Sequence, residues 1–391
     1  MIKKTILQYF TMTMLISFGM GSACAVYVTF LTSHGLNLLE VNLVNLVFFS
    51  TRFICEIPTG AFADVFGRKV SFVVSCILFS LGMFLYGLSN SFWGFVVSEA
   101  ITAIGSTFIS GAFDAWLVDM LNHHGGEDAK HNVFSKAGLI GQFACMVAAL
   151  AGAYLADIRG SLPWFMGSIV FAFTAILSAF WMKEEYFQKK AFSWSLGWRS
   201  MKDTVYSSIK YGLRNKVVRF IVLSSLVGML AFQAPNMQWQ PYFISFLKEK
   251  RNLGYLWIGM SLFMMLGSIL APHLLKLVKG EKRSLIVCNI FTGLCLAVTT
   301  MIPFFPGVVV YMVHEIPRGM IGPLKKKFLH DNIPSHARAT VASFESISPH
   351  LGGMIGLLAS GLIANTYSIS VAWLLSGIFL VVATLCVARK S

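Results

Sequence analysis

Long apolar runs separated by short polar segments dominate this sequence. Twelve runs can be counted, and most are at least as long as the roughly 20 residues that a helix needs to cross a bilayer. We predict a membrane-spanning helix for each. The ninth and tenth are separated only weakly, by Pro303, Pro306 and Gly307. The approximate limits are 8–31, 41–63, 70–88, 92–119, 132–157, 161–182, 217–246, 254–276, 285–304, 305–324, 338–364 and 367–388.

The polar segment after the sixth run is the longest connection, and it divides the runs into two sets of six. One fixed shift along the chain places residues 130–135 on 338–343 and Gly111 on Gly319, which is typical of two related halves. The pattern predicts an all-α membrane protein with two pseudo-symmetric six-helix halves, at 1–182 and 217–391. We interpret 183–216 as a cytoplasmic surface linker, and a regulatory role stays open.

Composition supports a membrane protein, because 56% of the 391 residues are hydrophobic and only 12% are charged. The net charge of +14 does not indicate nucleic acid, since the basic residues lie in short loops between apolar runs. Most fall on one side; we assign only Arg159, Lys248, Lys250 and Arg251 to the other. The positive-inside rule then predicts a multi-pass protein of the cytoplasmic (inner) membrane with both termini in the cytoplasm.

Several functional classes are disfavoured. No nucleotide-binding loop, metal cluster or nucleophile constellation is found, so we expect neither an enzyme nor a metal or organic cofactor. Lys3 and Lys4 precede an apolar run without a clear cleavage site, so no cleavable signal peptide is predicted. The cysteines lack metal-type spacing and are interpreted as buried thiols. They are Cys24, Cys55, Cys76, Cys145, Cys288, Cys295 and Cys386.

A charged turn between the second and third runs carries the most specific pattern. It reads Gly60-Ala-Phe-Ala-Asp64-Val-Phe-Gly67-Arg68-Lys69. Gly60 and Gly67 permit close helix approach and a tight turn. The spacing resembles the signature loop between helices 2 and 3 of the major facilitator superfamily. An ordinary basic loop is the alternative interpretation.

The resemblance implies twelve helices and transport by alternating access, with this turn as a conformational latch. In that family the loop arginine meets an acid at the inner end of helix 4, and Asp119 occupies that place here. Arg68 and Asp119 would pair in one state and separate in the other. The second signature loop of the family corresponds to Lys279–Arg283 in a degenerate form.

Acidic residues inside the runs are candidates for proton coupling, because ionisable groups at membrane depth are costly and usually functional. Glu315 is the first candidate and Asp114 the second, with Glu56 and Glu345 behind them. Arg52 lies four residues before Glu56, so these two side chains are placed to neutralise one another. For each acid a structural ion pair is the alternative. His314 adjoins Glu315, but successive helical residues point about 100° apart, so at most one faces a cavity well.

The seventh run contains amides, aromatic rings and two prolines, Pro235 and Pro241. These groups predict a bent helix that lines a substrate cavity. The alternative is a helix end that meets water. Together with residues from other runs, the predicted substrate-binding set is Tyr27, Gln142, Gln233, Asn236, Gln238, Trp239 and His314.

These features favour a monomeric secondary active transporter in the bilayer. The preferred function is proton-coupled export of amphipathic or cationic small molecules, because an acid in helix 10 resembles some multidrug exporters of the superfamily. Those exporters usually carry arginine in helix 4, whereas Glu99 stands here. An importer or facilitator for a defined metabolite is the first alternative, and a non-transporting receptor or scaffold is the second.

Overall fold

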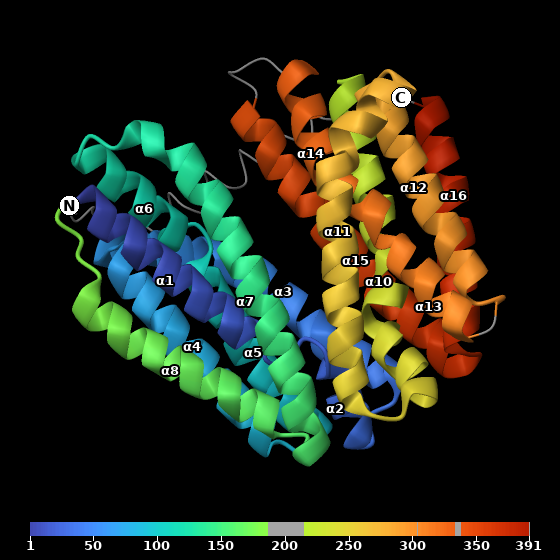
Figure 1. Ribbon diagram of the computed structural model, residues 1–391, viewed down its shortest axis with the longest axis horizontal. Coiled ribbons are helices and arrows are strands. Elements are labelled where there is room, and N and C mark those ends of the chain that lie inside the picture. Colours follow the sequence, from blue (N-terminus) through green and yellow to red (C-terminus); the bar gives the residue numbers. More distant parts are fainter. Residues whose placement is uncertain (187–214, 303, 333–337, 391) are drawn as a thin grey trace. The chain divides into compact units, whose positions relative to one another are not determined.

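The computed structural model describes residues 1–186, 215–302, 304–332 and 338–390, and within them the side chains of residues 57, 338–347 and 390 are not described. Most of the predicted linker, residues 187–214, therefore lies outside the described residues. Regular structure in the described ranges is helical, with no strand there, and Figure 1 follows it from α1 in blue to α16 in red.

Helices cover all twelve predicted runs, so the predicted all-α fold is confirmed. Nine segments of the described chain are long and apolar enough, taken alone, to cross a membrane. The helices are α1 (Ile2–Gly21), α2 (Tyr27–Ser33), α3 (Leu38–Phe66), α4 (Arg68–Leu88), α5 (Phe92–Ile109), α6 (Ala112–His123), α7 (Lys130–Ile158), α8 (Leu162–Trp181), α10 (Lys216–Leu247), α11 (Lys250–Val278), α12 (Glu281–Thr299), α13 (Phe304–Val313), α14 (Glu315–Asn332), α15 (Arg338–Thr366) and α16 (Ile369–Lys390).

Three of the twelve runs are broken, which the hydropathy pattern did not predict. The first is divided into α1 and α2, the fourth into α5 and α6, and the tenth into α13 and α14. In the fourth run Gly111 has φ 74°, a left-handed conformation that suits glycine because a Cβ there is unfavourable. In the tenth, the α-helix is interrupted at His314. Each break brings polar backbone to membrane depth, where neighbouring groups must satisfy it.

The seventh run forms one continuous helix, α10, with Pro235 and Pro241 inside it. Each proline removes one backbone donor from the helix, and the bend expected at these prolines stays a prediction. Side-chain bonds join this part of α10 to neighbouring helices: the Tyr311 hydroxyl donates to the Pro235 carbonyl at 3.2 Å, and Gln238 Nε2 donates to the Ser360 carbonyl at 3.0 Å.

The chain divides into two compact units. Unit 1 comprises Met1–Gly35, Val47–Trp198 and Leu247–Trp257. Within it α4 packs against α5 and α8, and α1 packs against α7. Serine hydroxyls of α4 bond to carbonyls of the neighbouring α5: Ser71 to Phe108 at 2.8 Å and Ser75 to Gly105 at 2.6 Å. Small hydroxyl residues thus hold these helices together, as is common in membranes.

Unit 2 comprises Leu36–Leu46, Arg199–Phe246 and Ile258–Ser391. Here α12 packs against α16 and α14. A buried apolar cluster joins α10, α11, α12 and α14, and large side chains such as Phe220, Leu285 and Phe328 fill it. The half boundaries expected from the sequence stay a prediction, since most of the linker between them lies outside the described ranges.

Candidate functional site

The predicted turn is a single residue, Gly67, between the end of α3 and the start of α4. Its φ of 99° is accessible to glycine and unfavourable for residues with a side chain. Asp64, in the last turn of α3, lies 3.6 Å from Arg68, between Oδ1 and Nη2. On the other side, Arg68 Nε lies 3.9 Å from Asp119 Oδ2 of α6. The structure therefore places the Arg68 guanidinium between the two carboxylates that the sequence suggested.

Glu184, which the sequence reasoning missed, completes this turn. It lies just after α8 and accepts from two backbone amides, Arg68 N at 2.8 Å and Lys69 N at 3.1 Å. Two basic residues at the start of α4 face the positive end of the helix dipole, which is unfavourable. The Glu184 carboxylate offsets that charge and satisfies two amides that lack partners within the helix. An added Cβ at Gly67 would lie 2.6 Å from Glu184 Oε2.

Neighbouring contacts hold the segment that carries Glu184. Trp116 Nε1 of α6 donates to the Lys183 carbonyl at 2.8 Å, and the Tyr186 hydroxyl donates to Glu184 Oε1 at 3.5 Å. Burial raises the pKa of Tyr186, so its hydroxyl stays protonated and remains a donor. Glu185 faces His124, with 3.8 Å between Oε2 and Nε2. The signal in the sequence that could have marked this segment is the pair of acidic residues, Glu184 and Glu185, in an otherwise basic loop.

Two expectations around the turn are not met. Nothing described lies within 4 Å of where a Cβ would stand at Gly60, so the close helix approach expected there is absent. Arg52 and Glu56 form no ion pair within the described part of the chain. Instead Glu56 Oε1 accepts from the Ser110 hydroxyl at 3.3 Å, at the break between α5 and α6. The Ser110 hydroxyl at this break is the described partner of the Glu56 carboxylate. A spacing of four residues on one helix was therefore not enough to pair Glu56 with Arg52.

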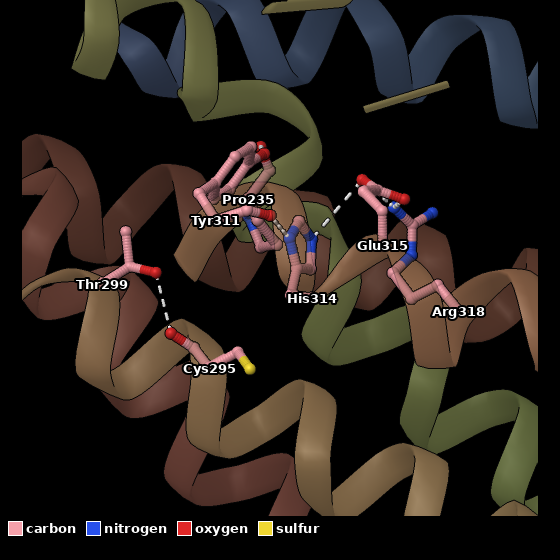
Figure 2. A network of polar contacts seen from close by, with 7 residues as sticks. All are labelled: Pro235, Cys295, Thr299, Tyr311, His314, Glu315 and Arg318. Atoms are coloured by element: carbon pink, nitrogen blue, oxygen red, sulfur yellow. Dashed lines mark hydrogen bonds and ion pairs between the residues drawn. The ribbon is translucent and has the colours of Figure 1, made fainter. Parts of the chain in front are cut away.

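A second polar cluster lies at the break between α13 and α14, and Figure 2 shows its side chains converging. Glu315 is the first residue of α14, and its side chain is only 3% exposed. Both of its oxygens lie 2.6 Å from Arg318 Nη1. His314 Nε2 lies 3.5 Å from Glu315 Oε1. His314 lies outside the α-helix, so the angle of about 100° between successive helical residues does not fix the relative direction of these two side chains. The expectation that at most one of them faces a cavity well stays a prediction.

Aromatic packing supports this break from the α10 side. His314 Nδ1 contacts the Tyr311 carbonyl, and the Tyr311 ring stacks on Trp373 with centroids 5.0 Å apart. The Arg318 guanidinium lies 3.3 Å from the centroid of the Phe232 ring. Arg318 is therefore held by a carboxylate and a ring face together, and both contacts favour the charged guanidinium.

Glu99 is a buried acid that the sequence reasoning noted only as a departure from drug exporters. It is 5% exposed on α5 and accepts a hydrogen bond from the Tyr86 hydroxyl. Tyr86 stacks on Trp164 with centroids 4.1 Å apart, and its hydroxyl lies 3.5 Å from that of Tyr27. Glu99 forms no ion pair with a described cation, so its burial is uncompensated by opposite charge.

The other predicted acids differ from one another. Asp114, in the first turn of α6, is exposed and accepts from the Tyr9 hydroxyl at 2.7 Å. Glu345 lies on α15, but its side chain is outside the described residues. Only Glu315 among the described candidates is both deeply buried and paired with a cation.

The predicted substrate residues do not all gather within one unit. Gln233, Gln238 and Trp239 are buried on α10, whereas Asn236 is exposed and its Nδ2 lies 3.4 Å from Gln233 Oε1. These residues and His314 belong to unit 2. Tyr27 and the half-buried Gln142 belong to unit 1. The amides on α10 serve helix packing in part, as the bond from Gln238 to Ser360 shows.

Comparison with known proteins identifies the family. The model of the Major Facilitator Superfamily matches residues 9–344. The chain belongs to the major facilitator superfamily. The resemblance first seen in the turn is thereby confirmed over most of the chain, and the protein is a multi-pass membrane transporter of this superfamily.

Relatives of this superfamily member are transporters. It is 21% identical over 392 residues to the uncharacterised MFS-type transporter YxaM of Bacillus subtilis, covering 96% of this chain and 93% of that protein. It is 26% identical over 166 residues to multidrug resistance protein 1 of the same organism, covering 42% of each. The solved structure of the nucleoside transporter NupG superposes with a TM-score of 0.82 at 14% identity, covering 99% of both chains. That last similarity concerns the fold alone.

Lys279–Arg283 spans the turn before α12 and the first residues of that helix, and its sequence resembles the second signature loop of the family in a degenerate form. α12 begins after Gly280, and its first residue, Glu281, supplies an acid within the helix itself. Glu281 Oε1 lies 3.2 Å from Lys327 Nζ of α14.

Proposed function

We propose that this superfamily member is a proton-coupled exporter of small amphipathic molecules that works by alternating access. Membership of a transporter family supports transport, and the partial similarity to a multidrug resistance protein supports export. An importer or facilitator would use the same fold, so the direction of transport needs a direct test.

The buried ion pair of Glu315 and Arg318 is the observation that carries the proposal. A carboxylate with 3% exposure is costly to keep charged unless a cation accompanies it. Arg318 Nη1 lies 2.6 Å from both oxygens, so the guanidinium compensates the charge of the buried carboxylate. A conformational change that separates the pair would leave Glu315 to take up a proton. Restoring the pair would release it, which links proton movement to the transport cycle.

Glu99 is a second candidate for a proton site, favoured by a different observation. Its described hydrogen-bond donor is a tyrosine, and no described cation forms an ion pair with it. A buried acid in that setting favours its neutral form. Asp114 stays a candidate as well, and its side chain is exposed.

Transport into proteoliposomes under an imposed pH gradient tests the proposal. A panel of a fluorescent amphipathic cation, a fluorescent carboxylic acid and a nucleoside should include at least one compound that accumulates against its gradient. Glu315→Gln should abolish that accumulation and leave exchange at equal pH largely intact. Glu249→Gln is the matched control, because Glu249 pairs with Arg251 at the exposed surface, 2.6 Å apart.

Other results would contradict specific parts of the proposal. Full gradient-driven accumulation by Glu315→Gln would remove Glu315 as the proton carrier. If Glu99→Gln or Asp114→Asn alone became uncoupled, the proton site would move to unit 1. Accumulation that occurs only in the import direction would replace export with uptake.

A further inference from the structure

Unit 2 contains a cavity of about 250 Å³ between α10, α12 and α14. Its wall is largely apolar, with residues such as Met229, Phe232 and Leu285. Polar side chains interrupt that wall from three helices. They are Ser224 and Ser225 of α10, Asn289 and Thr292 of α12, and Arg318 and Lys325 of α14.

The contacts among these groups leave hydrogen-bond donors available to the cavity. Asn289 Nδ2 donates to Ser224 Oγ at 3.1 Å, and Lys325 Nζ donates to Ser225 Oγ at 3.2 Å. Because each serine oxygen already accepts a bond, its own proton is available to a further acceptor. Thr292 is 4% exposed, and its hydroxyl has no hydrogen-bond partner among the described residues. A buried hydroxyl without a partner is costly unless something else bonds to it.

Arg318 adds a charge to these donors. Its Nη1 is occupied by Glu315, whereas no described acceptor contacts Nε or Nη2. Glu315 itself does not line the cavity, and no acidic residue is found among the described lining residues. A guanidinium with two unused nitrogens suits a carboxylate, which accepts two parallel bonds.

We propose that this cavity binds a small organic anion, with its carboxylate at Arg318 and its apolar body against Met229 and Phe232, while Ser225 and Thr292 offer further hydrogen-bond donors along the same wall. The inference rests on the proposed function and names a substrate class for it. The volume is below the range of about 300–1,000 Å³ for drug-sized ligands, so the ligand is small. The charged residues of the described lining, Arg318 and Lys325, are both basic, so anions are favoured over the cations that the sequence had allowed.

Three probes of one shape test the charge preference. Benzoate, benzyl alcohol and benzylammonium share a ring and differ mainly in charge, and their equilibrium binding is measured by calorimetry on the full chain in phosphatidylcholine nanodiscs. We expect saturable binding of benzoate and none of benzylammonium. Binding of benzylammonium as tight as that of benzoate would overturn the proposal.

Variants place the binding in this cavity. Arg318→Gln should weaken benzoate about tenfold or more, since it removes a charged donor. Because that change also removes the partner of Glu315, Ser225→Ala and Thr292→Val provide milder tests and should each weaken binding about threefold or more. Lys276→Gln is the control, a basic residue exposed on α11 outside the cavity. Unchanged affinity in Ser225→Ala and Thr292→Val would overturn the assignment.

The anionic headgroup of a lipid has the same chemistry as a free carboxylate, and added phosphatidylglycerol separates the two sources. Benzoate binding that this lipid leaves unchanged assigns the cavity to a soluble anion, and loss of binding assigns it to the headgroup. Equilibrium binding needs no gradient. Benzoate binding without pH-driven transport would therefore contradict the proposed function alone, and gradient-driven export of cations without benzoate binding would contradict this inference alone.

Discussion

Replacing Glu184 with glutamine should loosen the start of α4. Its carboxylate accepts from two backbone amides, at 2.8 and 3.1 Å, and faces two basic residues at the helix start. A helix cap contributes about 0.5–2 kcal/mol, and a favourable charge at the helix end about 0.3–1 kcal/mol. Their sum is about 1–3 kcal/mol, and glutamine retains one accepting oxygen, so the lower part of this range applies to it. Glu184→Ala should reach the upper part.

Hydrogen exchange at the amides of Arg68 and Lys69 measures this effect locally. A loss of about 1–3 kcal/mol corresponds to exchange about 5- to 150-fold faster, since about 1.4 kcal/mol is a factor of ten. Glu185→Gln is the control. That neighbouring acid faces His124 at 3.8 Å and accepts no backbone bond from the described part of α4.

Exchange rates that stay unchanged in Glu184→Gln and Glu184→Ala would refute the idea that this carboxylate holds the turn. Equal acceleration in Glu185→Gln would show that general charge loss, and not the cap, governs exchange. If the turn also acts as a latch, the Glu184 variants should alter transport rate at matched expression while Glu185→Gln does not.

Three further predictions concern charged contacts. Arg68→Ala and Asp119→Asn should each reduce transport, and the double variant should lose less transport activity than the sum of the two single losses. The expected coupling energy is about 1 kcal/mol or less, because the pair is partly exposed and its atoms are 3.9 Å apart. Additive losses would mean that the two residues do not pair. Asp157→Asn should speed hydrogen exchange at the start of α11, because the Asp157 carboxylate accepts from the first two amides of that helix at 2.8 and 3.1 Å. Unchanged exchange would refute the idea that Asp157 caps α11. The Lys327 ammonium lowers the pKa of Asp331, so their pair stabilises the fold above the ordinary aspartate pKa and loses this contribution as pH falls through the lowered value. Thermal unfolding between pH 5 and 3 should therefore depend less on pH in Asp331→Asn, and an unaltered dependence would exclude the pair as its source.

The sequence predicted the helices well because hydropathy reports directly on burial in lipid. The breaks in the first, fourth and tenth runs were missed for the same reason, since an apolar run keeps its hydropathy whether or not its backbone is continuous. Gly111 illustrates the difficulty: glycine is common within membrane helices, so its left-handed φ of 74° leaves no signal in composition. At the prolines of α10 the helix is continuous, and the bend that the sequence predicts there stays a prediction.

The candidate site is formed by contacts between helices that are distant in sequence, so predicting it depended on the resemblance to a known family. The pairing of Arg68 with Asp119 came from a family pattern, and the structure places the two side chains 3.9 Å apart. Glu184 lies 116 residues from the amide it binds, and no local pattern links such distant positions. The contact between His314 and Glu315 was not predicted, because the break at His314 leaves no signal in the sequence. Local periodicity therefore gave the elements, and contacts between elements could not be read from it.

The capping of α4 by Glu184 has a consequence for the order in which the protein is made. When the ribosome has produced α4, the two amides at its start do not yet have the Glu184 carboxylate that accepts their hydrogen bonds. That partner follows 116 residues later, after the sixth predicted span. Asp157 shows the reverse order, since it precedes the amide it caps by 93 residues and is already present when α11 emerges. The first turn therefore matures only once the sixth span has been inserted, and a chain interrupted before Glu184 would present an unfinished helix end to membrane quality control.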